Sequence, residues 1–270
     1  MSSTRTGLII VGDEILSGKR QDRHLARFIE LLAARGMQLD WARYIGDDRE
    51  ALTAVLREAF ASGDLVVSCG GIGATPDDHT RQAAAAALDR PLALHPEARA
   101  LIWARAQEMA AEKGETVDED APDMQRSFEM GVFPAGAAIV PNPYNRIPGF
   151  NVGSVYFVPG FPVMAHPMME WVLDRHPERH GAVGPKERSL IVQGAMEASL
   201  TPLMERIEAD FPGIKVFSLP SVDHPQWGRH IELGVKSPAP IEAERLDAAY
   251  AALLDGVREF GARVCAEMVR

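Results

Sequence analysis

The sequence predicts an α/β domain with a mostly parallel sheet, followed by a small α+β domain. Three observations lead to this prediction. Short apolar runs alternate with segments of helical spacing as far as residue 88, which is the pattern of βα units in a parallel sheet. A glycine-rich segment follows the third apolar run. A stretch rich in Pro, Gly, His and Arg then precedes a segment with the order βαββα. We therefore assign residues 1–175 to the first domain and 186–270 to the second.

The first half of the sheet can be justified one element at a time. Each expected strand is a short apolar run of the kind that a buried parallel strand needs. Gly36 ends the first helix, Asp47 or Asp48 caps the second, and a run of alanines favours the third. The expected strands are 6–11, 39–45 and 65–68, and the expected helices are 22–35, 48–62 and 80–88.

The rest of the first domain is expected to hold more helix and two short strands. The elements predicted there are helices over 96–113, 124–130 and 164–175 and strands over 138–140 and 154–158. The acidic segment 114–123 is interpreted as a solvated loop. Residues 141–150 contain three prolines and a glycine, which make this connection rigid. Such a loop suits a preorganised binding wall as well as a plain hairpin connection.

The second domain is predicted from a shorter series of elements. Its expected strands are 189–192, 214–219 and 230–235, and its expected helices are 200–211 and 241–260. This order gives a small α+β domain with both helices on one face of the sheet.

The glycine-rich segment is the strongest sign of a ligand site. Gly70, Gly71 and Gly73 come directly after a predicted buried strand and before a predicted helix. Glycines let the backbone take a positive φ and bring its N–H groups close to a ligand, and a helix N-terminus adds further donors. The segment therefore predicts a loop that binds an anion, in particular a phosphate.

Carboxylates stand beside this predicted anion site. Asp77 and Asp78 follow the glycines, and adjacent carboxylates next to a phosphate make sense if a divalent cation such as Mg²⁺ bridges them. Asp13 and Glu14 follow the first strand, so they are expected at the edge where open α/β sheets bind ligands. A purely structural alternative remains open. Asp77, Asp78 and Thr80 are also ordinary residues for a helix N-cap and first turn, and paired glycines can simply make a tight turn.

Two better-known phosphate motifs are excluded. Pro76 stands where the third glycine of a dinucleotide-binding fingerprint would fall. The segment from Gly12 to Gly18 has five residues between its glycines where a P-loop has four, and Arg20 replaces the Ser or Thr that would bind Mg²⁺.

Composition limits the classes of partner. The net charge of −10 argues against binding to nucleic acid or to an anionic membrane surface. A phosphorylated small molecule would then be held locally, by backbone amides, a cation and a few basic side chains. Cys69 and Cys265 form no disulfide framework, and no signal-peptide pattern or long apolar run is present, so a cytoplasmic location is expected.

Three motifs taken together resemble a known family. They are Gly12-Asp13-Glu14-Ile15-Leu16, Gly46-Asp47-Asp48 and the segment from Gly70 to Thr80, which reads GGIGATPDDHT. In order and spacing they are similar to the molybdopterin-binding (MoaB/Mog-like) domain of the competence/damage-inducible protein A family. The resemblance implies a three-layer domain followed by a small KH-like domain, and a homo-oligomer. Longer members carry a C-terminal nicotinamide-nucleotide amidase domain, which is not expected here because the chain ends before one could begin.

The resemblance also implies roles for particular residues. Asp47 and Asp78 match the aspartates that act in molybdenum insertion, so they are the expected catalytic residues. Asp77 and Asp78 are the expected metal ligands. In relatives that act as metal-dependent pyrophosphatases on ADP-ribose-like or flavin nucleotides, Asp13, Glu14 and Asp77 would join the acidic cluster. The expected ligand-binding residues are Gly12, Asp13, Glu14, Gly70, Gly71, Gly73, Thr75, Thr80, Asn142, Pro148 and Gly149.

The sequence departs from the family pattern at several points. Asn145 and Ile147 replace a glycine and an alanine of the usual proline-rich loop, and Met164 stands where relatives often have a glutamate. Arg23 or Lys19 could supply positive charge to a phosphate. Three functions stay open: a protein that binds a phosphorylated pterin or nucleotide, linked to molybdenum cofactor biosynthesis; an Mg²⁺-dependent nucleotide pyrophosphatase; and a non-catalytic assembly protein.

Overall fold

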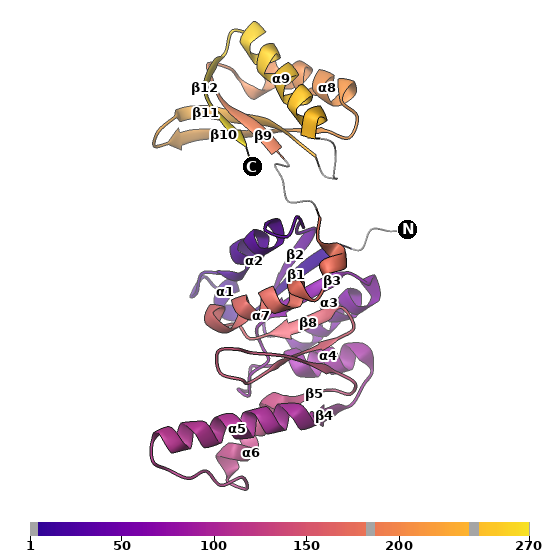
Figure 1. The fold of residues 1–270 in the computed structure, drawn as a ribbon, viewed down its shortest axis with the longest axis vertical. Helices are drawn as coiled ribbons and strands as arrows, with labels where there is room; N and C mark the ends of the chain where they lie inside the picture. The colour runs from indigo at the N-terminus through magenta and orange to yellow at the C-terminus, as the bar shows by residue number, and fades with distance from the viewer. Residues whose placement is uncertain (1–4, 182–186, 238–242, 270) are drawn as a thin grey trace. The chain divides into compact units, whose positions relative to one another are not determined.

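The computed structural model describes residues 5–181, 187–237 and 243–269. Contacts divide the chain into two compact units, Met1–His180 and Gly181–Arg270. Residues 176–180, which the sequence places in a linker, are fastened to the first unit: His176 Nε2 lies 2.8 Å from the Tyr156 hydroxyl, and His180 Nε2 lies 3.0 Å from the Leu173 carbonyl oxygen. Figure 1 shows both units, and each is described by itself below.

The first unit is built on a six-stranded sheet with the strand order β2-β1-β3-β8-β7-β6. Four neighbouring strands run parallel, the fifth runs antiparallel to them, and the sixth, at the edge, pairs antiparallel with the fifth. The four parallel neighbours are β1 (Thr6–Val11), β2 (Trp41–Ile45), β3 (Leu65–Cys69) and β8 (Val155–Val158); the fifth strand is β7 (Gly149–Val152), and the edge strand is β6 (Ala138–Val140). The predicted mostly parallel sheet is confirmed.

Helices cover both faces of this sheet, which gives the three-layer arrangement that the family resemblance implied (Figure 1). Helices α2 (His24–Ala33) and α7 (Pro162–Asp174) pack on one face, against Leu8 and Ile10 of β1. Helices α3 (Arg49–Ser62) and α4 (Thr80–Leu88) pack on the other, against Ile9 and Val11. Successive side chains of a strand point to opposite faces, so the apolar run of β1 serves both layers.

An arm extends from the first unit between two short paired strands (Figure 1). Strands β4 (Leu92–Leu94) and β5 (Val132–Pro134) pair antiparallel and enclose α5 (Pro96–Glu112), α6 (Pro122–Phe128) and the 3₁₀ turn η1 (Glu129–Gly131). The predicted helices of this region are present. Sequence analysis missed β4, β5 and β7, because these strands have three or four residues and include or follow prolines.

The second unit is an antiparallel sheet with two helices on one face. Its elements are β9 (Glu187–Gln193), α8 (Glu197–Asp210), β10 (Lys215–His224), β11 (Gly228–Lys236), α9 (Ala243–Glu259) and β12 (Arg263–Val269), and its strand order is β10-β11-β9-β12. Both helices share one core with Leu190, Leu233 and Val235, so the predicted α+β class is confirmed. The last strand was not predicted, because Glu267 interrupts its apolar residues; it completes the split β-α-β-β-α-β motif.

An aromatic stack forms the centre of the first unit beside the antiparallel strands. Phe150 stacks on Phe133 and on Phe157, with ring centroids 4.7 and 4.3 Å apart. Gly149 precedes Phe150 in β7, and a Cβ at Gly149 would collide with the carbonyl oxygen of Phe157. Gly149 is therefore required by strand packing, and it lies behind the pocket described below.

We predict that Gly149→Ala lowers the free energy of unfolding by about 3 kcal/mol, because the obstacle is a backbone atom that cannot rotate away. Gly153→Ala is the control. Gly153 has a φ of 58° and open space around it, so alanine there costs only about 1 kcal/mol. Urea unfolding followed by tryptophan fluorescence measures both variants. Equal losses would show that the contact with β8 does not constrain Gly149.

Candidate functional site

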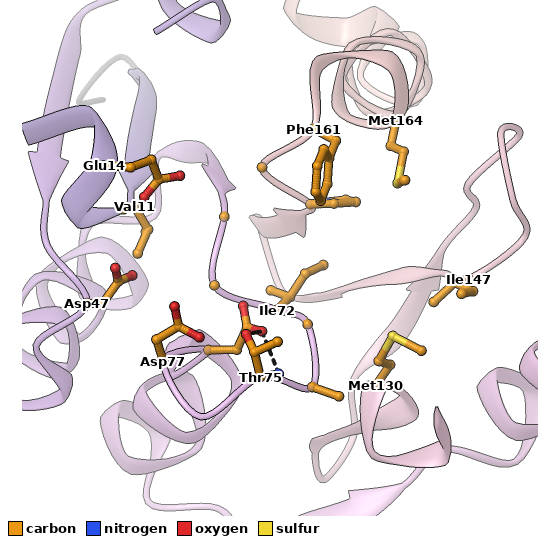
Figure 2. A pocket seen from close by; sticks show the side chains of 18 of the residues that line it. Val11, Glu14, Asp47, Ile72, Thr75, Asp77, Met130, Ile147, Phe161 and Met164 are labelled. Carbon is orange, nitrogen blue, oxygen red and sulfur yellow. Dashed lines mark hydrogen bonds between the residues drawn. The ribbon is translucent and has the colours of Figure 1, made fainter. Parts of the chain in front are cut away.

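The carboxyl ends of the four parallel strands meet at a pocket of about 710 Å³, a volume within the usual range for small-molecule sites. Glu14 follows β1, Asp47 follows β2, the glycine loop (residues 70–75) follows β3, and Phe161 follows β8. Because the strands lie in the order β2-β1-β3-β8, the carboxylates lie on one side of the glycine loop and the apolar side chains on the other (Figure 2).

Two of the three glycines in the loop take the positive φ that the sequence predicted, and Gly73 does not. Gly70 and Gly71 have φ values of 106° and 69°, which favour glycine. The N–H of Gly70 donates to the Val158 carbonyl (3.0 Å) and so is not available to a ligand. In the described part of the chain, the next four amides, from Gly71 to Ala74, donate to no other protein group. Successive free amides of this kind form an anion-binding concavity.

Three side chains hold the loop from behind. Thr80 is fully buried, and its hydroxyl donates to the Gly70 carbonyl (2.9 Å). Asp78 Oδ2 accepts hydrogen bonds from the Thr75 amide (2.9 Å) and hydroxyl (2.5 Å). Arg81 donates to the carbonyls of Gly73 (2.5 Å) and Glu129, and burial lowers the pKa of its guanidinium. These contacts fix the position of the free amides.

The residues predicted around the glycine loop lie in different positions in the structure. Thr80 does not line the pocket, so its predicted contact with the ligand is replaced by a role in shaping the loop. His79 occupies the N-cap position of α4, so Asp77 and Asp78 precede the helix rather than cap it. Asp77, Asp78 and Thr75 all line the pocket.

Carboxylates form the wall on the β1 and β2 side. The side chains of Glu14, Asp47 and Asp77 point toward one another in Figure 2. Asp13 does not line the pocket; its amide donates to Asp47 Oδ2 (3.0 Å), and its own Oδ1 accepts from the Asp47 amide (3.3 Å). These reciprocal bonds fix Asp47, and no protein group in the described residues donates to its Oδ1.

The pKa values of this acidic wall reflect its crowding. Burial raises the pKa of Asp47; the Asp13 amide opposes this shift, and the charges of Asp13, Glu14 and Asp77 raise the pKa further. The pKa of Asp77 is lowered, first by the nearby Thr75 hydroxyl and then by its own amide. Asp77 therefore stays ionised while Asp47 holds a proton more readily than an ordinary aspartate.

An apolar wall faces the carboxylates across the loop. It consists of Ile72, Met130, Ile147, Phe161 and Met164 (Figure 2). Asn142 is buried at the base of the proline-rich loop, and its Nδ2 donates to Asn145 Oδ1 (2.8 Å) and to the Ile147 carbonyl (3.0 Å). Asn142 thus shapes this wall with a side chain that is already bonded within the loop. Pro148 lines the pocket as predicted, and Gly149 does not.

Several residues of the site were missed by sequence reasoning. Arg81 gave no signal, because one arginine in a helix is usually on its surface. His24, also missed, is buried under the rim, where its Nε2 lies 3.0 Å from the Gly160 carbonyl and must donate to it. Met130 comes from the arm and could not be placed near the loop from its sequence position. Of the two cations singled out from the sequence, Lys19 lines the pocket and Arg23 does not; Arg20 joins Lys19 there.

A cation at the acidic wall would need ligands from outside the protein. Among the described residues, no group of three or more His, Cys, Asp and Glu is arranged to hold a metal ion. The donor set nonetheless suits Mg²⁺, which is commonly bound by one or two carboxylates together with waters and phosphate oxygens of the substrate. Within the described ranges, no helix is both long and apolar enough to cross a bilayer.

Comparison with known proteins agrees with the fold of the first unit. Residues 7–178 match the family model described as a probable molybdopterin binding domain, and the chain belongs to this family. A CinA-like protein of Syntrophotalea carbinolica is 33% identical over 77% of this chain and 51% of its own length. A Pyrobaculum calidifontis protein is 30% identical over 93% of this chain and 95% of its own length. The crystal structure of CinA from Thermoplasma acidophilum superposes with a TM-score of 0.51 at 27% identity, over 65% of this chain and 98% of that one.

These matches confirm the resemblance inferred from the three motifs. The chain spans about half the length of the CinA-like relative from Syntrophotalea, so the activity of that whole protein does not transfer to it.

We predict that Thr80→Val destabilises the protein by about 1–3 kcal/mol, because it leaves the Gly70 carbonyl without its buried donor. Thr80→Ser keeps the hydroxyl and should lose less than half of that. Hydrogen exchange at the Gly71–Ala74 amides, compared between the two variants, reports the loosening of the loop. Unchanged exchange in the valine variant would contradict this role.

We predict that Asp47→Asn raises stability near pH 7 by roughly 0.5 kcal/mol, the size expected of partly screened charges. Because the pKa of Asp47 is raised, the folded state binds the proton more tightly than the unfolded state, and stability falls as the pH rises through the folded pKa. Urea unfolding from pH 3 to pH 8 should therefore show the two proteins converging below about pH 3.8, the ordinary aspartate value. Asp48→Asn, which keeps the α3 cap to Ala51, should bring no gain; a gain there would contradict the assignment.

Proposed function

We propose that this chain binds a small phosphorylated ligand that carries a flat heterocycle, a pterin or a nucleotide, in the pocket at the carboxyl ends of β1, β2, β3 and β8. The observation that carries the proposal is the row of four free amides between a wall of carboxylates and a wall of apolar side chains. Amides bind phosphate oxygens, and Phe161 and the methionines offer a surface for a ring. The name of the matching family supports a pterin among these ligands.

The two walls would determine the orientation of the bound ligand. Its phosphate would lie over β1 and β3, where the amides and carboxylates are, and its ring would lie toward β8, against Phe161 and Met164. A phosphate beside Glu14, Asp47 and Asp77 needs a cation to offset the repulsion between like charges. One or two of these carboxylates would hold Mg²⁺ together with waters and phosphate oxygens of the ligand, and the bound cation would neutralise phosphate charge.

Asp78 takes a different part in this proposal. Because Thr75 donates twice to its Oδ2, Asp78 sets the shape of the loop and presents its remaining oxygen to the pocket. Such a binding protein would fit a role in molybdenum cofactor biosynthesis, in the cytoplasm.

A second candidate function, hydrolysis of a pyrophosphate bond, is favoured by the raised pKa of Asp47. The Asp13 amide occupies Asp47 Oδ2, so Oδ1 would accept a proton from an attacking water. The water oxygen would bond to one phosphorus while the bond from that phosphorus to the bridging oxygen breaks, leaving two monophosphates. Met164, where relatives often have glutamate, adds no carboxylate to this chemistry.

We predict that the full chain with Mg²⁺ retains at least one of ADP-ribose, FAD, NAD and a molybdopterin-type compound in native mass spectrometry and titration calorimetry. Asp77→Asn should weaken that binding about tenfold or more, the size of one contact to a charged group. Asp89→Asn, the same change at the exposed far end of α4, is the matched control.

The same samples separate the two candidate functions. Cleavage to a nucleoside monophosphate that is lost in Asp47→Asn would establish the hydrolase. Retention without cleavage would leave the binding function alone, and failure of the wild type to retain any of the four compounds would refute both.

A further inference from the structure

Two basic side chains reach the pocket from the connection between the short helix α1 (Asp13–Leu16) and α2. Lys19 and Arg20 both line it, as do Glu14, Asp47 and Asp77. The backbone that carries them is held in place: the Arg20 amide donates to the Glu14 carbonyl (2.9 Å), and the Gly18 amide donates to the Ile15 carbonyl (3.1 Å). The two cations therefore have a fixed point of attachment close to the phosphate end of the site.

Neither cation pairs with a carboxylate in the described part of the chain. Elsewhere in the described residues, Arg27, Arg35 and Arg43 each form an ion pair with a carboxylate. Lys19 and Arg20 form none in the same part of the chain, although Glu14, Asp47 and Asp77 line the same pocket. An anionic ligand in this pocket would form charge-assisted hydrogen bonds with these two unpaired cations.

The glycine loop and the cation pair are separate groups of donors. The free amides of the loop follow β3, and Lys19 and Arg20 follow β1, the neighbouring strand. One phosphate can use the loop amides in full, which leaves the two cations facing water. A second phosphate linked to the first would extend from β3 toward β1 and meet them, on the side away from the apolar wall.

We propose that Lys19 and Arg20 are specificity-determining residues that bind this second phosphate, so that the pocket selects ligands with two linked phosphates over monophosphates. The inference rests on the proposed function, since it requires that the first phosphate lies on the glycine loop. By this inference, the connection between α1 and α2 makes the pocket prefer a ligand with two phosphates. The residues near β8 contact the ring.

ADP and AMP test this inference because they share a ring and differ by one phosphate. In titration calorimetry with Mg²⁺, the wild-type chain should bind ADP at least tenfold more tightly than AMP. Lys19→Ala combined with Arg20→Ala should weaken ADP binding about a hundredfold, about tenfold for each lost contact to a charged group, and change AMP binding by less than twofold.

Two controls make the result specific. Arg23→Ala removes a charge from the same connection at a side chain that does not line the pocket, so ADP binding should be unchanged. Lys19→Arg combined with Arg20→Lys keeps both charges and should restore most of the ADP affinity. The salt dependence of ADP binding should be steeper in the wild type than in the double alanine variant.

Other outcomes would overturn the inference. If the double alanine variant loses ADP and AMP equally, or loses neither, the cations do not recognise a second phosphate. If the wild type binds ADP no more tightly than AMP, the inference fails and the proposed function stands. If the wild type binds neither nucleotide and retains none of the four compounds named above, the proposed function fails, and the inference fails with it.

Discussion

The close approach of Gly70 to the Val11 carbonyl is the constraint on which the rest of the site depends. A Cβ at Gly70 would strike that oxygen, so only glycine lets the chain leave β3 across the end of β1. Thr80 then returns from the start of α4 to bond the Gly70 carbonyl, which ties the two ends of the loop together. The free amides, the carboxylates after β1 and β2, and the apolar wall near β8 all take their positions around this crossing.

Several charges of the pocket work against the stability of the fold. Burial raises the pKa of Asp47, and the charges of Glu14 and Asp77 raise it further. Among the described residues, Lys19 and Arg20 line the same pocket and form no ion pair. In contrast, some basic residues on the helix surfaces of the same unit are paired with acids, as Arg27 is with Glu170. Unrelieved charge of both signs in one pocket is typical of functional sites.

The parts of the site that sequence could predict are those encoded within a few residues of one another. The glycine loop, Asp47, Asp77 and Glu14 each follow a short apolar run, and parallel strands bring such residues to one edge. Arg81, His24 and Met130 could not be predicted, because their positions depend on contacts with segments far away in the chain, such as that between Arg81 and Glu129. The same holds for β12 and β7, whose pairing partners rather than their own residues make them strands.

The arm between β4 and β5 has a small hydrophobic cluster of its own, formed by Ile102, Met124 and Phe128, against which Met130 and Ile147 pack. One part of the apolar wall is thus the outer surface of a core that is distinct from the two that support the sheet. Substitutions inside the arm can alter the width and shape of the pocket beside the apolar wall. They leave Gly70 and the carboxylates unchanged. In the proposed binding mode, relatives could therefore differ in the heterocycle that they bind while holding the phosphate in the same way.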